Sequence, residues 1–308
     1  MAGVLAPPRG SRVTAPVVHT LRPSDVAALR LPGRRGAESV RRLLEVHPGR
    51  SVWVPATLEY ALIGPWRNRP EIASIEDLVA VRHLEELLRA AVERCADQGD
   101  ELVLTVELDS RRSPARYERA GLEMLEEVIT YQIGVPREPW AGSDHIRLVP
   151  VDANDQAAIN LVTRIDQASF PWLWRNNRAE FDVYLHTPGV EVWLVEEDGD
   201  PVAYFGVTLF PDWGHLDRVA VVPEQQGRGF GLETLGLAVD TMRQRGARRV
   251  GLSTQRTNRR SQRLYERFGF QRTPEHDYRL FGAWCRAEPH AGLLGVGQGQ
   301  KFADHAHE

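Results

Sequence analysis

The sequence predicts an α/β fold built as two tandem units, and three observations lead to this prediction. The stretch Gly214–Phe270 alternates strand and helix patterns around a glycine-rich run. A related helix, strand and helix pattern lies 148 residues earlier in the chain. Finally, 308 residues with 42% hydrophobic and 26% charged residues are typical of a globular chain of about two domains.

The first unit starts with a strand pattern at Val17–Leu21 and an amphipathic helix pattern at Ala37–Val46. Apolar residues at every second position predict strand structure over Ser51–Ile63. Helical spacing of apolar residues predicts a long helix over Leu78–Ala96, and a strand pattern returns over Glu101–Leu108.

A linker is predicted at Gly134–Asp144, which holds two prolines and two glycines. The second unit begins beyond it with further alternating patterns. They predict a strand at Ile146–Asp152, a helix at Asp155–Ser169, an aromatic loop at Phe170–Trp174, a helix at Arg178–Leu185, and a hairpin of strands Val190–Glu196 and Val202–Phe210.

The glycine-rich run lies where the strand pattern Leu216–Val222 passes into a long helix pattern. Gly227, Gly229 and Gly231 lack a side chain, so the backbone can turn tightly and its N–H groups can converge. The start of the next helix adds further free N–H groups and the positive end of its dipole. This arrangement predicts a cradle for a phosphate or pyrophosphate.

Two familiar phosphate-binding motifs do not fit this run. A dinucleotide-binding fingerprint needs an acidic residue about 20 residues later, at the end of a second strand. Here the second strand ends in Ser253-Thr254-Gln255. A Walker loop needs Gly-Lys-Ser/Thr, and Lys301 is the only lysine in the chain.

The order of these residues resembles the GCN5-related N-acetyltransferase (GNAT) superfamily. The matching features are Gln226, Gly229 and Gly231 in a Gln-x-x-Gly-x-Gly run, then Asn258, and then the segment Leu264–Phe270 (LYERFGF). The resemblance implies that each unit is a mixed β-sheet with helices on both faces, in an α/β fold that some schemes class as α+β. It also implies an acyltransferase with acetyl-CoA as co-substrate and no metal.

In this family acetyl-CoA lies between two parallel strands that splay apart, here Leu216–Val222 and Arg249–Thr254. The resemblance implies that the backbone of Val219, Ala220 and Val221 binds the pantetheine arm. It implies a pyrophosphate site formed by Gln226, Gly227, Arg228, Gly229, Phe230, Gly231 and Leu232. Arg228 could equally be solvated. Asn258 and Ser261 are expected beside the CoA arm, although Asn258 could simply cap a helix.

Attack of an amine on a thioester needs a neutral amine, a polarised carbonyl and a proton for the departing thiolate. The resemblance implies that Tyr265 is the general acid and that the N–H near Val219 binds the carbonyl oxygen. His215 takes the position of a glutamate base in several family members, and a histidine suits proton abstraction near neutral pH. Asp217 is the second candidate, while an exposed strand-end histidine and a packed tyrosine are the alternatives.

The segment Arg116–Leu122 (RYERAGL) matches Leu264–Phe270, with Tyr117 and Tyr265 lying 148 residues apart. The offset also superposes the helix and strand patterns of the two units, which indicates an internal repeat. At this offset the first copy has Leu78, Val81 and His83 opposite Gln226, Gly229 and Gly231. We therefore expect no cradle there and predict a structural or substrate-shaping role. The layout is similar to that of the mycothiol synthases.

The predicted boundaries are a disordered leader 1–16, a degenerate domain 17–140, a catalytic domain 143–286 and a disordered tail 287–308. A net charge of −4 argues against a nucleic-acid partner. Cys95 and Cys285 make neither a disulfide framework nor a metal site, and no apolar run reaches the ~18 residues of a membrane span. We expect a cytoplasmic monomer or homodimer.

The predicted function is acetyl transfer to a primary amine of a small molecule or protein. The alternative is a non-catalytic acyl-CoA-binding module whose first copy serves as an interaction platform. In the family, the region of Phe170–Trp174 and the following Arg175, Asn176, Asn177 and Arg178 lines the acceptor site. An acceptor with a carboxylate and a merely packed aromatic cluster both remain open.

Overall fold

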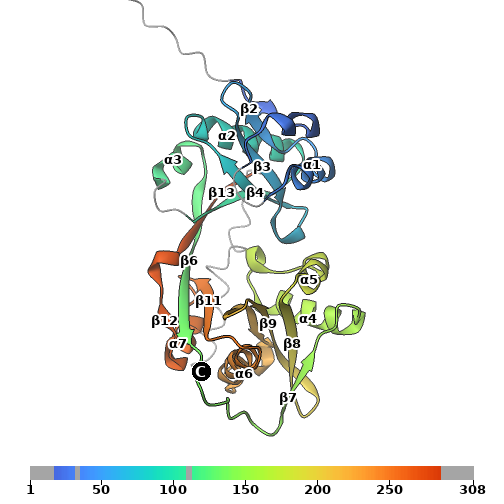
Figure 1. Cartoon of the computed structure of the whole chain (residues 1–308), viewed down its shortest axis with the longest axis vertical. Helices are drawn as coiled ribbons and strands as arrows, with labels where there is room; N and C mark the ends of the chain where they lie inside the picture. Colours follow the sequence, from blue (N-terminus) through green and yellow to red (C-terminus); the bar gives the residue numbers. More distant parts are fainter. Residues whose placement is uncertain (1–16, 32–34, 109–112, 286–308) are drawn as a thin grey trace, which may run out of the picture.

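A computed structural model describes residues 17–31, 35–108 and 113–285. The predicted leader 1–16 and tail 287–308 lie outside the described residues. Figure 1 shows two lobes, one for each predicted unit, connected by two long strands that run between them.

The strands of both lobes form one continuous mixed sheet. In the first unit, five neighbouring strands follow chain order: β1 (His19–Thr20), β2 (Val52–Val54), β3 (Glu59–Pro65), β4 (Ile72–Val79) and β5 (Leu102–Glu107). The second unit repeats this order with β7 (Ile146–Pro150), β8 (Val190–Glu197), β9 (Asp200–Leu209), β10 (Trp213–Val221) and β11 (Arg249–Gln255).

Each half of the sheet is completed by a strand from the other unit. Strand β6 (Glu123–Gly134) ends the first unit, yet its second half pairs with β11. Strand β13 (Tyr278–Trp284) ends the second unit, yet it pairs with β5. The two exchanged strands also pair with each other, and the short β12 (Gln271–Arg272) adds to β6. The predicted domains 17–140 and 143–286 are therefore joined by backbone hydrogen bonds between strands of different units.

Helices cover both faces of each half-sheet, which confirms the predicted fold class. Helix α6 (Phe230–Gln244) and helix α7 (Arg259–Phe268) share one apolar cluster with β10 and β11. On the opposite face, α4 (Gln156–Ser169) and α5 (Arg178–Leu185) form another cluster with β8 and β9. The first unit has α2 (Leu84–Asp97) and α3 (Pro114–Arg119) on one face and α1 (Ala37–Val46) on the other.

Most predicted elements form, and two are corrected. The strand pattern Ser51–Ile63 is a hairpin, because residues 55–58 turn between β2 and β3. The long helix predicted from Leu78 begins at Leu84, and Leu78 itself lies in strand β4. Strand β4 was missed because Glu76 and Asp77 interrupt its apolar pattern, where both carboxylates form ion pairs with Arg35.

The predicted linker packs against the second unit. The indole of Trp140 lies over Gly236 of α6 and 5.5 Å from the ring of Phe268. Its ring N–H donates to Glu233, and its backbone N–H donates to Asp240, both at 3.3 Å. A side chain at Gly236 would overlap the indole, so this position requires glycine.

Both units contain the same seam between two parallel strands. In each, four consecutive residue pairs join the strands, ending at Ile75–Thr105 in the first unit and Leu216–Leu252 in the second. One extra residue then bulges from the first strand of each pair, Glu76 in β4 and Asp217 in β10. This common geometry supports the predicted repeat.

The connection that follows the seam differs between the units. Helix α2 begins eight residues after the Glu76 bulge, whereas α6 begins thirteen residues after Asp217. The starts of α2 and α6 are 146 residues apart but the two bulges only 141, so one offset of 148 does not hold through this loop. Pairing Leu78, Val81 and His83 with the second unit's cradle was therefore wrong. The first unit lacks the residues that would build such a loop.

A buried carboxylate occupies the shortened turn of the first unit. Glu59 is only 5% exposed and accepts hydrogen bonds from the backbone N–H groups of Arg82 and His83, at 2.9 and 2.8 Å. These donors immediately precede α2, in the region where a phosphate would otherwise bind. The Glu59 carboxylate thus already occupies the backbone N–H groups that a bound phosphate would need.

We expect Glu59→Ala to lower the free energy of unfolding by about 2 kcal/mol, because two backbone donors lose their acceptor. Urea denaturation measures the loss. The exposed pair of Glu38 and Arg41 provides the control, and Glu38→Ala should change stability by less than about 0.5 kcal/mol. An unchanged midpoint for Glu59→Ala would show that the donors find another acceptor.

Candidate active site

The seam of the second unit leaves one edge of β10 without a strand partner. Strands β10 and β11 pair only as far as Leu216 and Leu252. Further along, Val219, Ala220 and Val221 continue to pair with β9 on their other side. The backbone beyond the bulge is thus held firmly on one side and open toward β11, as the predicted binding of an extended chain requires.

A loop with unpaired N–H groups follows this open edge. Gly227 and Gly229 have φ values of 85° and 98°, and a side chain on either would meet no atom within 4 Å. None of the backbone N–H groups from Gly227 to Gly231 donates to an acceptor within the described residues. Leu232 and Glu233 donate to the Gly229 carbonyl, which begins α6. Consecutive free amides at a helix start fit a pyrophosphate.

The polar side chains around this loop have partners within the protein. Gln226 donates to the Val221 carbonyl at 3.2 Å and accepts from Arg260, so it connects β10 to α7. Arg228 forms an ion pair with Glu197 at 3.0 Å and lies 5.0 Å from the Phe230 ring. Backbone amides therefore form the unpaired part of the predicted pyrophosphate site.

Helix α7 begins at the opposite side of the seam. Asn258 caps it by accepting from the Ser261 N–H at 3.1 Å. This agrees with the alternative in which Asn258 is an N-cap. The side-chain NH2 group of Asn258 makes no hydrogen bond within the described residues. Contact of Asn258 and Ser261 with the CoA arm stays a prediction.

Tyr265 lies inside the apolar cluster that α6 and α7 form against the seam. Its side chain is 5% exposed and packs 6.0 Å from the ring of Tyr131 and 6.1 Å from that of Phe270. Burial raises the pKa of Tyr265 to about 12, although a hydrogen bond with Ser261 opposes the rise. The hydroxyl thus keeps its proton at neutral pH. The matching Tyr117 of the first unit instead bonds Glu107 and stacks on Phe281.

His215 and Asp217 form a hydrogen-bonded pair on the other face of the sheet. The His215 Nδ1 atom lies 2.6 Å from Asp217 Oδ1. The second oxygen of Asp217 accepts from Tyr184 of α5 at 2.5 Å and from Thr208 of β9 at 2.6 Å. With its carboxylate held in this way, Asp217 favours the tautomer that carries hydrogen on Nδ1 and leaves Nε2 as a proton acceptor.

The aromatic loop after α4 is anchored by a buried arginine next to this pair. Arg218 forms an ion pair with Asp166, which is completely buried, and donates to the Trp174 carbonyl at 2.9 Å. Its guanidinium also lies 3.7 Å from the centre of the Phe170 ring. The aromatic cluster is therefore packed, and it is fixed to the strand that carries His215.

The first unit contributes a second anchor through the turn between β3 and β4. Trp66, in η2 (Trp66–Asn68), donates to the Leu173 carbonyl at 2.8 Å. Asn68 donates to Glu180 at 2.6 Å, and Asn177 donates back to the Asn68 carbonyl at 2.8 Å. The loop that lines the acceptor site in the resembling family is thus held by both units.

Three residues near the site were not predicted from the sequence. Tyr184 and Thr208 reach Asp217 from a helix and a strand whose patterns indicate only packing. Arg67 enters from the other unit and donates to Asn176 at 2.7 Å. No motif marks these residues; only their three-dimensional placement reveals them.

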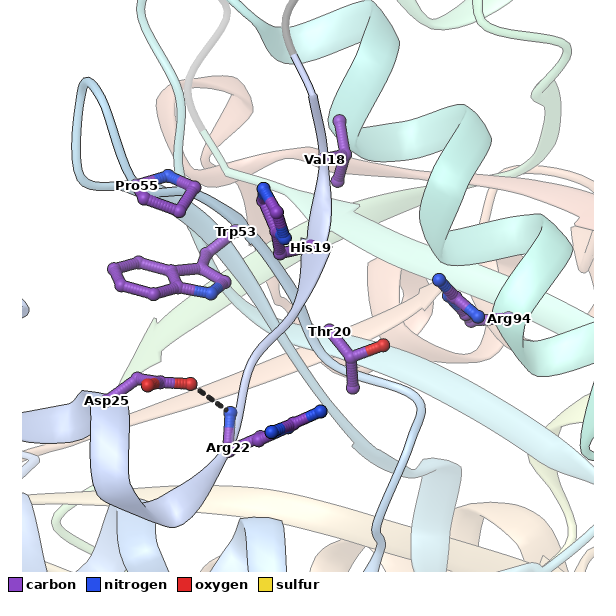
Figure 2. A pocket seen from close by; sticks show the side chains of 8 residues that line it. All are labelled: Val18, His19, Thr20, Arg22, Asp25, Trp53, Pro55 and Arg94. Atoms are coloured by element: carbon purple, nitrogen blue, oxygen red, sulfur yellow. Dashed lines mark hydrogen bonds between the residues drawn. The ribbon is translucent and has the colours of Figure 1, made fainter.

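A separate hollow of about 410 Å³ lies on the first unit (Figure 2). Trp53, Arg22 and Arg94 are among its lining residues, and none of the lining residues belongs to the seam. In the described ranges, no cluster of three or more His, Cys, Asp or Glu side chains could hold a metal ion. None of the helices built from those residues is long and apolar enough to cross a membrane.

Comparisons with known proteins match this geometry. Residues 148–270 match the family described as "Acetyltransferase (GNAT) family". Over 113 residues the chain is 28% identical to a putative [ribosomal protein bS18]-alanine N-acetyltransferase of Bacillus subtilis, covering 37% of this chain and 74% of that protein. It is 38% identical over 88 residues to the mycothiol acetyltransferase of Beutenbergia cavernae, covering 28% of this chain but only 30% of the relative.

Solved structures share the fold over most of the chain. A GCN5-related N-acetyltransferase from Sphaerobacter thermophilus has a TM-score of 0.61 at 20% identity and covers 89% of this chain and 96% of its own. A tandem GNAT protein from the clavulanic acid biosynthesis pathway has a TM-score of 0.54 at 14% identity and covers 89% of this chain and 99% of its own. These structures confirm the predicted tandem arrangement.

The open cradle predicts that Gly229→Glu abolishes CoA binding measured by calorimetry, because the substitution strains the backbone and places a carboxylate among the free amides. Gly199, in the β8–β9 turn, has a similar φ of 92° and equally open surroundings. Gly199→Glu should therefore bind CoA normally. Residual stoichiometric binding by the Gly229 variant would place a nucleotide site elsewhere, for instance in the first unit.

Proposed function

Because residues 148–270 belong to the GNAT acetyltransferase family, we propose that this chain transfers an acetyl group from acetyl-CoA to a primary amine of a small molecule or protein. The family confirms the predicted acyltransferase class. Nothing in the described residues favours the alternative of a non-catalytic binding module. The observation that carries the proposal is the open edge of β10 leading directly into the unpaired amides of Gly227–Gly231.

These two features fit the two parts of the co-substrate. The amides from Gly227 to Gly231 would hold the pyrophosphate, helped by the dipole of α6. The unpaired edge at Val219–Val221 would bind the amide groups of the pantetheine arm like a short strand. The thioester then lies in the seam, between the cluster that contains Tyr265 and the face that carries His215.

The proposed reaction is direct attack. His215 Nε2 accepts a proton from the ammonium group of the acceptor, and Asp217 stabilises the imidazolium that results. The amine nitrogen bonds to the thioester carbon, whose oxygen accepts a hydrogen bond from the backbone near Val219. The carbon–sulfur bond breaks as Tyr265 gives its proton to the departing thiolate. The nitrogen releases its second proton, which restores the Tyr265 hydroxyl, and His215 returns the first proton to solvent. The products are the amide and free CoA.

The direct test is a screen of amines for thiol release from acetyl-CoA. The screen should include alkylamines, amino acids and peptides with a free N-terminus, because the curated relatives are named for a protein acceptor and for a small-molecule acceptor. Amine-dependent thiol release together with the acetylated product supports the proposal. Thiol release without acetylated amine would contradict it.

Tyr265→Phe should lower kcat by about 100-fold while leaving the Kd for acetyl-CoA nearly unchanged, because only the proton donor is removed from a buried ring. The neighbouring Tyr131 is also buried and donates its hydroxyl proton to Glu266. Tyr131→Phe is therefore the matched control and should retain most of the activity. A Tyr265→Phe enzyme as fast as the parent would remove the role assigned to Tyr265.

His215→Gln should lower kcat/KM by about 100-fold for an alkylamine that is protonated at the assay pH. The loss should be much smaller for an amine of low pKa, because such an acceptor arrives already neutral. The exposed pair of His145 and Asp198, 3.4 Å apart, supplies the control, and His145→Gln should behave like the parent. Equal losses for both kinds of amine would mean that His215 is not the base.

A further inference from the structure

Arg67 is a cation without an anion at the junction of the two units. Its Nη1 atom donates to the neutral amide oxygen of Asn176 at 2.7 Å. Its Nε atom is buried and has no hydrogen-bond partner, and no ion pair to Arg67 exists within the described residues. A guanidinium withdrawn from water normally has a carboxylate or phosphate as its partner.

The carboxylates near Arg67 are committed to other groups. Asp166 forms an ion pair with Arg218 and accepts from the Asn176 N–H and the Tyr204 hydroxyl. Glu180 accepts from Asn68 at 2.6 Å. Burial, followed by the positive charge of Arg218, lowers the pKa of Arg67 to about 10. Both carboxylates raise the pKa of Arg67 through space, but neither forms an ion pair with Arg67 within the described residues.

The shape of the unpaired edge suits a carboxylate. With Nη1 bonded to Asn176, the Nε–Nη2 edge of Arg67 has no described partner, and this edge presents two parallel N–H groups. The guanidinium lies beside two indoles that contact each other, 5.3 Å from the Trp66 ring and 5.4 Å from the Trp174 ring. The Trp174 ring N–H is a second buried donor without a partner, on a residue that is 6% exposed.

The backbone at this position is also unusual. Arg67 and Asn68 both have positive φ values, 52° and 51°, which residues other than glycine rarely adopt. Such strain is maintained only where surrounding contacts enforce it, and it concentrates at ligand-binding positions. The contacts of Trp66 and Asn68 with the aromatic loop enforce it here, and they hold Arg67 at the junction.

Arg67 is connected through the aromatic loop to the strand that carries the proposed base. Arg218, its cationic neighbour, follows Asp217 directly in β10, and Asp217 bonds His215. Tyr278, on the exchanged strand β13, is close enough to influence the charge of Arg67 and forms a hydrogen bond with Ser253 on the seam strand β11. Arg67 therefore contacts the same aromatic loop that Arg218 fixes to β10, the strand that carries His215.

We propose that Arg67 binds a carboxylate of the amine acceptor, so that the degenerate first unit supplies acceptor specificity to the second. This inference rests on the proposed acetyl transfer. The acceptor class is a small-molecule amine that also carries a carboxylate. Because Nε is shielded from solvent, binding must shift the edge of Trp66 or Trp174, and it should therefore change tryptophan fluorescence.

The test compares ω-amino carboxylates of increasing chain length with the corresponding ω-amino amides, which lack the negative charge. In the parent enzyme, kcat/KM should be roughly 10- to 100-fold higher for the carboxylate of the best length, as expected for a charge-assisted bidentate contact. In Arg67→Gln this preference should disappear, mainly through KM, while the rates with amides change little. Arg67→Lys should restore only part of the preference.

Arg69→Gln is the matched control. Arg69 lies in the same turn and stacks 4.5 Å from the Trp172 ring, but it is already paired with Glu71 at 2.5 Å. Its replacement should lower the melting temperature without changing the carboxylate preference. The fluorescence change caused by the best amino carboxylate should persist in Arg69→Gln and vanish in Arg67→Gln.

The possible failures are distinguishable. If no amine releases thiol from acetyl-CoA, the proposed acetyl transfer is wrong. If amines are acetylated but carboxylates and amides react equally well, only the assignment of Arg67 is overturned. A carboxylate preference that Arg67→Gln leaves intact, in a protein with an unchanged melting temperature, would likewise reject this residue as the binding group.

Discussion

The exchange of β6 and β13 is the constraint on which the rest of this structure depends. Each strand leaves its own unit and pairs with the last strand of the other, so the backbone hydrogen bonds of one half are completed by the other half. Apolar residues of both strands, including Leu125 and Leu280, then form one cluster with Leu173 and Trp174 of the aromatic loop. The exchange therefore brings the turn that carries Arg67 against the aromatic loop of the second unit.

The two units contain the same seam between parallel strands, but the loop that follows it has unpaired amides in one unit and paired amides in the other. Both possess the parallel strands and the bulge that open the seam. In the second unit a longer loop with glycines leaves a row of amides unpaired. In the first, the loop is shorter and the Glu59 carboxylate permanently occupies the helix start. The length of the connection and one buried acid therefore decide whether the amides before the helix are paired or unpaired.

The sequence predicted features that depend on local geometry. Gly227 and Gly229 are recognisable because positive φ values require glycine, and Tyr265 belongs to a motif with a fixed position at a helix end. The strand exchange was not predictable, because an alternating pattern does not identify which strand will pair with it. Arg67 carried no signal either, since its role depends on a loop more than a hundred residues away.

Each half-sheet arranges five strands of its own and borrows a sixth. Two identical chains related by a twofold axis would satisfy the same bonds, as in a domain-swapped homodimer. Joining them covalently makes the swap intramolecular, so it no longer depends on protein concentration. Covalent fusion also removes the requirement that the two units stay identical. One unit can therefore lose its binding pocket and take on a role in selectivity while it remains attached to the other.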